Sequence, residues 1–421
     1  MHLIYNISIQ LYLLAIKVAA LFNPKAKQWL QGRKNLFEEL QQSITDEDEI
    51  IWFHVASLGE FEQGRPLMEK VKESFPGHKI LLTFFSPSGY EVKKSYEGAD
   101  YIFYLPMDTQ SNARKFVSIV KPKMVIFVKY EFWFNYINEL YINKIPLLMI
   151  SVIFRPSQHF FQFWGRWFRK QLSKITWFYV QNKQSIDLLK NINIYHADKS
   201  GDTRFDRVKA LANEQHNIPA VERFKGKNLL MVAGSSWPPD EDILKYVLEK
   251  SAKPFKLIVA PHVVNNSHVS ELQQKFAPWN PILFTDFDSS FSKESAVLIL
   301  NTTGILSQIY RYADISYVGG GFGAGIHNLL EPATYGQPVL FGPNFKKFQE
   351  AHDLIDIKAG YPISNKEETL KTIDLLLGDD ALRAGIGNKA KKYVTDNAGA
   401  TDIVLNKIKE FIVEPSTVNK L

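Results

Sequence analysis

The stretch Tyr317-Val-Gly-Gly-Gly-Phe-Gly-Ala-Gly-Ile-His-Asn-Leu-Leu-Glu-Pro-Ala-Thr-Tyr-Gly-Gln-Pro-Val-Leu-Phe-Gly-Pro343 decides the fold of this chain. It is typical of a buried strand, a glycine-rich loop, a short helix and a second buried strand. The loop glycines are Gly319, Gly320, Gly321, Gly323 and Gly325. Glycines let a backbone approach a ligand closely, and the N–H groups at the start of the following helix would favour an anion there.

Two polar residues of this helix extend the interpretation. Asn328 and Glu331 are three positions apart, so they share one helical face. A phosphate at the loop and ribose hydroxyls at the carboxylate would suit a sugar nucleotide. The alternative is an ordinary tight turn of an α/β domain, because glycine-rich motifs also occur without a ligand.

Composition narrows the class of protein. The 421 residues are enough for two domains, and 45% hydrophobic with 22% charged residues is typical of a folded protein. The net charge of +6 favours an anionic partner. Nucleic acid ranks last among such partners, because no zinc-finger, basic-helix or RNA-recognition signature accompanies the charge. The absence of cysteine from the sequence excludes disulfides and thiolate metal sites.

The N-terminus indicates a membrane surface. Residues 3–22 are mostly apolar but are interrupted by Asn6, Gln10 and Lys17. The segment is long enough to cross a bilayer, yet its polar interruptions favour an interfacial helix. Basic residues follow it, which favours the cytoplasmic side and anionic headgroups: Lys25, Lys27, Arg33 and Lys34. The alternative is an amphipathic helix packed on its own domain.

A second stretch, residues 160–170, interleaves aromatic with basic residues. This pattern is typical of a headgroup interface. The alternative is a helix whose aromatic side chains fill a core.

Apolar runs alternate with helical periodicity from residue 50 onward, which predicts parallel sheets covered by helices. The first set of predicted strands is 50–55, 80–84, 101–104, 124–128 and 147–152. The second set follows a looser region and comprises 229–233, 256–260, 296–300, 315–318 and 338–341. Two such sets predict an α/β chain with two doubly wound Rossmann-like domains that face a cleft, with ligands at the carboxyl ends of the strands.

Polar side chains follow several of these strands. Ser57, Gly59 and Glu60 come after the first one. Glu60 would stand in the first turn of a helix, where an acid commonly serves only the helix dipole. The functional alternative places it at the cleft as a general base.

Five stretches in unbroken order carry a resemblance to a known family: 54–60 (His-Val-Ala-Ser-Leu-Gly-Glu), 81–91, 121–133, 234–242 and 319–343. They resemble the Kdo transferases, glycosyltransferases that move 3-deoxy-D-manno-octulosonic acid (Kdo) from CMP-Kdo onto a lipid A precursor. The resemblance covers nearly the whole chain, including the apolar N-terminus and Gly32-Arg33-Lys34.

The resemblance implies a GT-B fold with an N-terminal acceptor domain and a C-terminal CMP-sugar domain. The expected boundaries are 1–35 for a membrane-associated segment, 36–212 for the acceptor domain and 213–421 for the donor domain. It also implies inverting transfer of Kdo to lipid IVA for the lipopolysaccharide core, at the cytoplasmic face of the inner membrane. The donor substrate is CMP-Kdo, and no metal or other cofactor is expected.

The resemblance also assigns site residues. The catalytic base is Glu60. The residues expected to bind CMP are Pro261, His262, Thr303, Gly304, Ile305, Asn328, Leu329, Leu330 and Glu331. The residues expected to contact the acceptor or the transferred sugar are Ser57, Gly59, Ser86, Ser88 and Glu131.

Three positions depart from the family's pattern. His262 stands where relatives usually have arginine, and its charge near neutral pH depends on its surroundings. Lys129 replaces a common acid, and Phe134 replaces a common proline. These changes bear on the details of phosphate and acceptor binding rather than on the fold.

Three other functions remain open from the sequence. The first is a GT-B enzyme that uses a different sugar nucleotide, since such enzymes also carry a ribose-binding carboxylate. The second is a catalytically inactive membrane-bound scaffold. The third is a nucleotide-sugar epimerase of the same fold, which the apolar and basic N-terminus disfavours.

Overall fold

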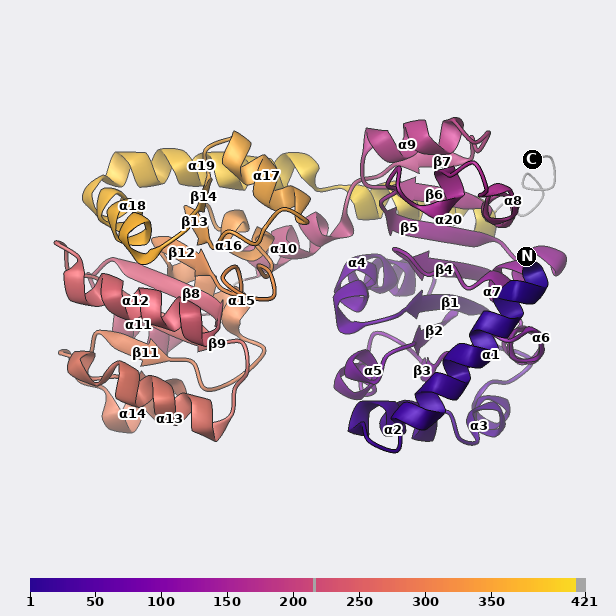
Figure 1. Cartoon of the computed structure of the whole chain (residues 1–421), viewed down its shortest axis with the longest axis horizontal. Helices are drawn as coiled ribbons and strands as arrows, with labels where there is room; N and C mark the ends of the chain where they lie inside the picture. Colours follow the sequence, from indigo (N-terminus) through magenta and orange to yellow (C-terminus); the bar gives the residue numbers. More distant parts are fainter. Residues whose placement is uncertain (215–216, 414–421) are drawn as a thin grey trace. The chain divides into compact units, whose positions relative to one another are not determined.

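The computed structural model describes residues 1–214 and 217–413. The chain divides into two compact units (Figure 1). Unit 1 contains Met1–Arg207 and the chain from Ala398 onward, and unit 2 contains Val208–Asn397. Each unit is built on its own sheet, so each is described by itself.

Unit 1 is a parallel sheet of seven strands in the order β3-β2-β1-β4-β5-β6-β7. Its strands are β1 (Ile50–Val55), β2 (Lys79–Phe84), β3 (Tyr101–Tyr104), β4 (Met124–Val128), β5 (Leu147–Val152), β6 (Trp177–Val180) and β7 (Ala197–Lys199). Every residue of β1, β4 and β5 is buried. This burial explains why these strands are continuous apolar runs rather than alternating ones, since helices cover both faces of such a sheet.

The helices of unit 1 connect or flank these strands. They are α1 (His2–Ala19), α2 (Pro24–Gln31), α3 (Leu36–Ser43), α4 (Leu58–Ser74), α5 (Pro87–Lys93), α6 (Gln110–Val120), α7 (Phe134–Ile142), η1 (His159–Phe161), α8 (Arg166–Leu172), α9 (Lys183–Lys190) and α20 (Ala400–Val413). The division between the units falls within α10 (Thr203–Asn213).

Unit 2 repeats the plan with a sheet in the order β10-β11-β9-β8-β12-β13-β14. Its strands are β8 (Leu230–Ser236), β9 (Lys256–Pro261), β10 (Ile282–Leu283), β11 (Val297–Ile299), β12 (Ile315–Val318), β13 (Val339–Phe341) and β14 (Gly360–Pro362). Its helices are α11 (Pro219–Lys225), α12 (Pro238–Lys250), α13 (Asn266–Lys275), η2 (Ala277–Trp279), η3 (Phe284–Asp286), α14 (Phe287–Ser290), α15 (Leu306–Ile309), η4 (Tyr310–Tyr312), α16 (Leu330–Thr334), α17 (Gln349–Asp356), α18 (Lys366–Gly378) and α19 (Asp380–Asn397).

The fold prediction is confirmed: both units are doubly wound α/β sheets, and all ten predicted strands are present within a few residues. Strands β6, β7, β10 and β14 are not among the predicted strands; β6 and β7 are the last two strands of the first sheet, and β10 and β14 are the edges of the second. Three of these four have only two or three residues, too few for a clear apolar run.

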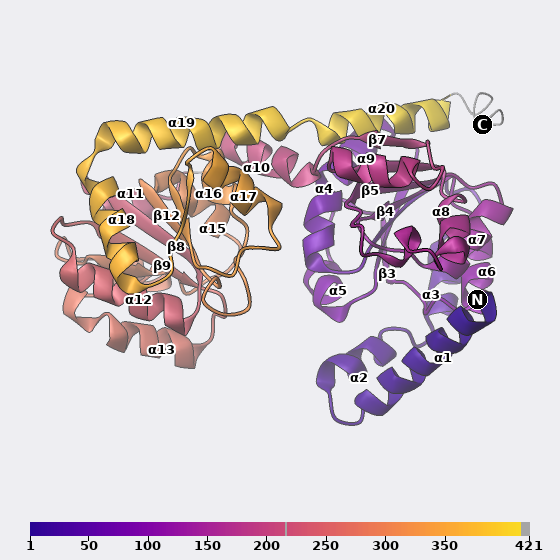
Figure 2. The ribbon, with the colours of Figure 1, turned by 45° about the horizontal axis from the view of Figure 1, so that its top comes forward.

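The C-terminal helix packs with the first unit. Val404, Leu405 and Ile408 of α20 lie in the same core cluster as residues of β1, β2 and α4, and Figure 2 shows α20 lying against unit 1. The predicted donor domain, 213–421, thus extends past the compact unit 2 by this helix. The apolar pattern of α20 is amphipathic and does not identify the sheet it covers.

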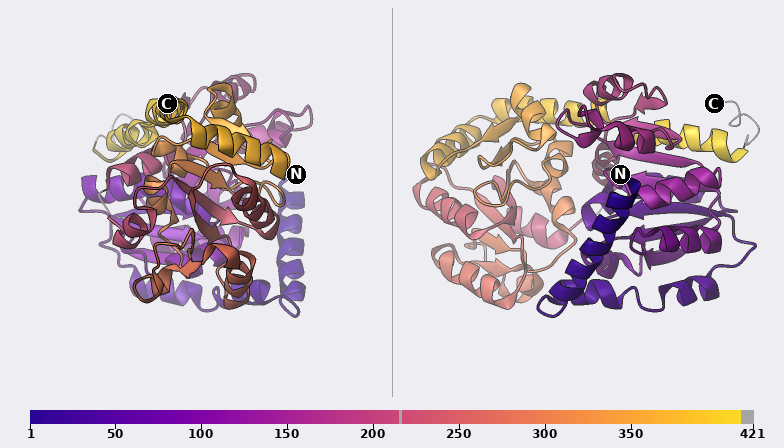
Figure 3. Two further views of the ribbon diagram at one scale, coloured as in Figure 1. Left: turned by 90° about the vertical axis from the view of Figure 1, so that its left-hand side faces the viewer. Right: turned by 45° about the vertical axis from the view of Figure 1, so that its right-hand side comes forward.

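Helix α1 lies along the outside of unit 1, beside α2 (Figures 2 and 3). Among the described residues, α1 is the one helix long and apolar enough to cross a membrane. Its side chains are mostly exposed, including Leu3 at 71% and Leu11 at 60%. The neighbouring Leu21 and Phe22 are exposed at 75% and 85%.

Polar contacts hold the start of α1 to the fold. The Tyr5 hydroxyl donates to the carboxylate of Asp108, which is buried at 1% exposure. Asn135 Nδ2 donates to Asn6 Oδ1 at 2.9 Å, and His2 Nε2 lies 3.2 Å from Asn135 Oδ1. We call these five side chains the latch. Asn6, one of the polar interruptions of the apolar segment, thus has a partner inside the fold.

Asp108 also caps α7. Its carboxylate accepts from the backbone N–H groups of Asn135 at 3.1 Å and Tyr136 at 3.0 Å, in the first turn of that helix. The N–H of Phe134 donates to the Tyr5 hydroxyl at 3.4 Å. A proline at position 134 would lack that N–H. Phe134, which stands where the family commonly has proline, therefore supplies a hydrogen-bond donor to Tyr5 of α1.

The aromatic and basic stretch 160–170 combines buried aromatic side chains with exposed ones. Phe160 is buried, and Trp167 and Phe168 pack against the core. Phe163 is 94% exposed and Trp164 is 52% exposed. The stretch therefore fills part of the core and also presents two aromatic rings to the outside.

We predict that Asp108→Ala destabilises unit 1 by about 3 kcal/mol. The substitution leaves two buried backbone N–H groups and the Tyr5 hydroxyl without an acceptor, and each such loss costs about 1–3 kcal/mol. Chemical denaturation followed by tryptophan fluorescence measures the change. Asp46→Ala, which removes an exposed carboxylate paired with Lys121, is the control and leaves the unfolding midpoint unchanged. An equal effect of the two substitutions would contradict the role of Asp108.

Candidate active site

The candidate residues of unit 1 meet at the carboxyl edge of its sheet. β2 and β4 pair with β1 on either side, so the loops that follow these three strands are neighbours. The N–H of Ser86 donates to the carbonyl of Ala56 at 2.8 Å, which joins the loops after β1 and β2. The structure therefore brings together the predicted residues Ser57, Gly59, Glu60, Ser86, Ser88 and Glu131, all of which lie on these three loops or the helix starts that follow them.

Glu60 takes part in the start of α4. Its Oε2 accepts from the backbone N–H groups of Ala56 at 2.8 Å and Ser57 at 2.9 Å, and from the Ser57 hydroxyl at 3.2 Å. Ser57 and Glu60 together form a capping box. The structural and functional roles predicted for Glu60 are therefore compatible, because Oε1 has no hydrogen-bond partner among the described residues.

The surroundings of Glu60 favour the protonated form of its carboxyl group. Burial raises the pKa of the Glu60 carboxyl, and the nearby charge of Glu131 raises it further. The Ser57 hydroxyl, the charge of Lys129 and the Ala56 N–H lower the pKa, but the net shift is upward. A carboxylate with a raised pKa is a stronger base, which is what proton abstraction near neutral pH needs.

Glu131 belongs to a buried polar cluster. Its Oε2 accepts from Trp133 Nε1 at 2.6 Å and lies 3.1 Å from His54 Nε2. His54 is fully buried, and its Nδ1 lies 2.9 Å from the Thr83 hydroxyl. His54 and Trp133 are not among the predicted site residues. A histidine within a buried apolar strand was the one available signal, since such a side chain needs polar partners.

Gly59 and the two serines differ in their local roles. A Cβ at Gly59 would meet only Ser57 Oγ, at 4.0 Å, so packing does not require glycine there. Ser86 caps α5 by accepting from the N–H of Ser88, and the two hydroxyls lie 2.8 Å apart. The exposed Ser88 and Gly59 are therefore open to a ligand, whereas Ser86 also has a structural role.

The glycine-rich loop of unit 2 follows β12 and is closely packed. A Cβ on Gly319 would lie 2.4 Å from the carbonyl oxygen of Ser235, and one on Gly321 would lie 2.6 Å from the backbone of Gly342. Gly320 has a φ of +88°, which favours glycine. These glycines therefore have structural reasons of their own. The following helix, α16, has only five residues, so its contribution to anion binding is small.

The predicted pair Asn328 and Glu331 is formed. Asn328 Nδ2 donates to Glu331 Oε1 at 3.1 Å, and Asn328 Oδ1 accepts from the N–H of Leu330 at 3.1 Å. The side chains of Leu329 and Leu330 are fully buried. These two predicted nucleotide contacts therefore lie beneath the surface of unit 2.

Three rings stack beside this pair. His262, at the carboxyl end of β9, stacks on Trp237 at 4.7 Å and on His327 at 4.4 Å between ring centroids. Trp237 Nε1 donates to His327 Nε2 at 3.4 Å. Burial lowers the pKa of His327, and the neighbouring His262 lowers it further. The stack joins the Pro261–His262 and Asn328–Glu331 segments, and sequence reasoning missed Trp237 and His327 as its members.

The third predicted segment of unit 2, Thr303-Gly304-Ile305, lies on the loop after β11, next to β9 in the sheet. Thr303 and Gly304 are exposed, and Gly304 has a φ of +91° with open space around it. Ile305 packs partly against the core of unit 2. This segment thus shares the carboxyl edge of the sheet with the ring stack.

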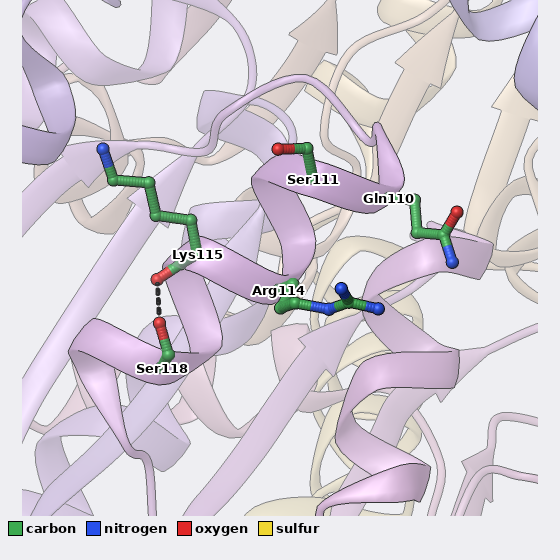
Figure 4. A pocket seen from close by; sticks show the side chains of 5 residues that line it. All are labelled: Gln110, Ser111, Arg114, Lys115 and Ser118. Atoms are coloured by element: carbon green, nitrogen blue, oxygen red, sulfur yellow. Dashed lines mark hydrogen bonds between the residues drawn. The ribbon is translucent and has the colours of Figure 1, made fainter.

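Two other features do not extend the site. Within the described residues, no cluster of three or more His, Asp or Glu side chains could hold a metal ion. A hollow of about 490 Å³ on α6 is lined by Gln110, Ser111, Arg114, Lys115 and Ser118 (Figure 4). These side chains come from the outer face of one helix, and none lies on a loop with a candidate residue.

Comparison with known proteins identifies relatives. Residues 30–207 match the family model described as 3-Deoxy-D-manno-octulosonic-acid transferase (kdotransferase). The 3-deoxy-D-manno-octulosonic acid transferase of Aquifex aeolicus is 27% identical over 334 residues, which cover 78% of this chain and 86% of that protein. The enzyme of the same name from Rickettsia bellii is 25% identical over 86% of this chain and 88% of its own length.

Solved structures agree on the fold. UDP-GlcNAc 2-epimerase from Neisseria meningitidis bound to UDP-GlcNAc matches with a TM-score of 0.60 at 14% identity, over 86% of this chain and 100% of that chain. A glycosyltransferase from Rickettsia africae matches with a TM-score of 0.55 at 15% identity, over 88% and 100% of the two chains. At these identities the likeness shows the fold alone, which is the predicted GT-B type.

We predict that Glu131→Gln lowers the pKa of Glu60. The substitution removes a like charge while an amide oxygen can still accept from Trp133, so ionisation of Glu60 becomes easier. Carbon-13 NMR titration of the glutamate carboxyls, with Glu60 assigned by mutation, measures the shift. Glu73→Gln, at the exposed far end of α4, leaves the titration of Glu60 unchanged. An unchanged or raised pKa in Glu131→Gln would contradict the coupling.

Proposed function

Because the chain is a relative of the Kdo transferases and is itself a glycosyltransferase, we propose that it transfers Kdo from CMP-Kdo to a lipid A precursor, lipid IVA, in the biosynthesis of the lipopolysaccharide core. The observation that carries the proposal is the arrangement of Glu60: one oxygen held by the start of α4, the other without a partner among the described residues, and a raised pKa.

In the proposed reaction, Glu60 is the general base. Oε1 takes the proton of an acceptor sugar hydroxyl while the hydroxyl oxygen attacks the anomeric carbon of Kdo. CMP leaves from the opposite face, so the configuration inverts. The two backbone N–H groups on Oε2 keep the carboxylate oriented during this step.

The proposed donor site is in unit 2. Glu331, oriented by Asn328, would accept hydrogen bonds from the ribose hydroxyls. The imidazoles of His262 and His327 and backbone N–H groups near the glycine-rich loop would stabilise the phosphate as CMP leaves. These groups supply the charge stabilisation without a metal ion or other cofactor, and CMP-Kdo itself is the donor substrate.

The proposed location is the cytoplasmic face of the inner membrane. The apolar side chains exposed along α1 would enter the interface, and the exposed Lys25 and Lys34 would contact anionic headgroups. Arg33, predicted with them, instead donates to backbone carbonyls inside unit 1. Phe163 and Trp164 add two exposed aromatic rings that suit such a surface. Nucleic acid is not a partner in this proposal.

We predict that Glu60→Gln lowers the rate of Kdo transfer at least about a hundredfold, the usual range for loss of a general base. The amide oxygen of glutamine still accepts from Ala56 and Ser57, so α4 begins normally and the affinity for CMP is unchanged. Mass spectrometry of products from CMP-Kdo and lipid IVA measures the transfer, and calorimetry measures CMP binding. Near-normal turnover of Glu60→Gln, with Glu73→Gln as the active control, would exclude Glu60 as the base.

We predict that His262→Arg strengthens CMP binding at pH 8 by about tenfold. Arginine is always charged, and its planar guanidinium can donate two parallel hydrogen bonds to a phosphate, which an imidazole cannot. The increase in melting temperature caused by CMP is the measurement, since a ligand that binds only the folded state stabilises it. UDP is the control nucleotide. A UDP effect equal to that of CMP in the unmodified protein would favour a different donor.

A further inference from the structure

A groove in unit 1 borders the candidate active site and shares one predicted residue with it, Ser86. It has a volume of about 400 Å³ and lies between α1, α2 and the loop that enters α5. The residues that line it are Tyr12, Ala15, Ile16, Ala19, Lys25, Ala26, Trp29, Phe85, Ser86 and Pro87. Most of these side chains are apolar, and small alanines on both helices leave the space open. We call this feature the α1–α2 groove.

The groove shares a wall with the candidate active site. Phe85, on its floor, packs against Trp133 with ring centroids 4.7 Å apart, and Trp133 donates to Glu131. The next residue, Ser86, donates its N–H to Ala56, whose own N–H holds Glu60. Two short chains of direct contacts therefore lead from the groove to the two carboxylates.

The walls of the groove are held in place. The latch fixes the first turns of α1 to Asp108 and Asn135. The guanidinium of Arg33 stacks on Trp29 at 3.6 Å and donates to the carbonyls of Trp29 at 3.0 Å and Phe85 at 2.7 Å. The groove is therefore a built feature of unit 1, and not a gap beside a loosely attached helix.

The chemistry of the lining identifies a class of ligand. Apolar side chains favour a hydrocarbon chain. The indole N–H of Trp29 is buried and has no hydrogen-bond partner among the described residues, and the ester or amide carbonyl at the head of an acyl chain is an acceptor. Lys25, at the groove, matches an anionic head group in charge.

We propose that the α1–α2 groove binds one acyl chain of the glycolipid acceptor and so places the acceptor's sugar at Glu60. This inference rests on the proposed function, because it assumes a lipid acceptor. It makes α1 a part of the acceptor site. It also requires α1 to stay on unit 1 at the membrane surface, since a helix that left the latch to cross the bilayer would open the groove.

Filling the groove tests the proposal kinetically. Ala15→Phe places a ring in the groove, and Val18→Phe places the same ring on α1 outside it. With CMP-Kdo as donor, we expect the KM for the acylated acceptor to rise about tenfold in Ala15→Phe alone, with the KM for the deacylated, water-soluble acceptor unchanged. An unchanged KM for the acylated acceptor, or an equal loss with both acceptors, would overturn the proposal.

Photo-crosslinking tests the same proposal without turnover. A lipid IVA analogue with a diazirine on one acyl chain should label peptides within residues 12–29 or 85–87, and Ala15→Phe should abolish that labelling. Labelling elsewhere, or equal labelling by a phospholipid diazirine of the same chain length, would overturn the assignment to the acceptor. Failure of the proposed function is distinguishable, because the unmodified protein would then transfer Kdo to neither acceptor.

Discussion

Parallel pairing of the strands is the constraint on which the rest of this structure depends. When all strands of a sheet run one way, every loop that leaves a carboxyl end lies at the same edge. Glu60 and Glu131, although distant in sequence, thereby come close enough for the charge of Glu131 to raise the pKa of Glu60. In unit 2 the same constraint places His262 and His327 ring against ring. Both groups of candidate residues are consequences of topology more than of any local motif.

The sequence predicts some of the strands and residue pairs and not others. Mostly apolar runs identify strands such as β1 and β4, because burial on both faces leaves few polar positions; His54 is the exception in β1. They do not identify β10 or β14, which have two and three residues. The three-residue spacing of Asn328 and Glu331 predicts the pair, but the helix is wrong for Asn328: α16 begins at Leu330, and Asn328 reaches Glu331 from the loop before it. The pairing of His54 with Glu131 is not, because their 77-residue separation is closed only by the sheet.

Glu60 shows why a structural and a functional explanation need not compete. A first-turn glutamate in a capping box is common, and here one oxygen accepts from three donors. Those bonds leave Oε1 oriented and without a partner among the described residues. Burial and Glu131 raise the carboxyl's pKa more than the capping bonds lower it. In the proposed reaction the cap would therefore position Glu60 as the base, and its surroundings would set its proton affinity.

Polar contacts also determine how α1 is placed. Its composition alone allows a spanning helix, an interfacial helix or a helix packed on its domain. The latch decides which residues have partners: Tyr5 and Asn6 turn toward Asp108 and Asn135, and Leu3 and Leu11 remain exposed. A helix that crossed a bilayer would give up those polar contacts and place Asn6 in hydrocarbon, where an unpaired amide costs several kcal/mol. A helix α1 that lies on a membrane surface would keep its polar partners inside the protein and present its exposed apolar side chains to lipid.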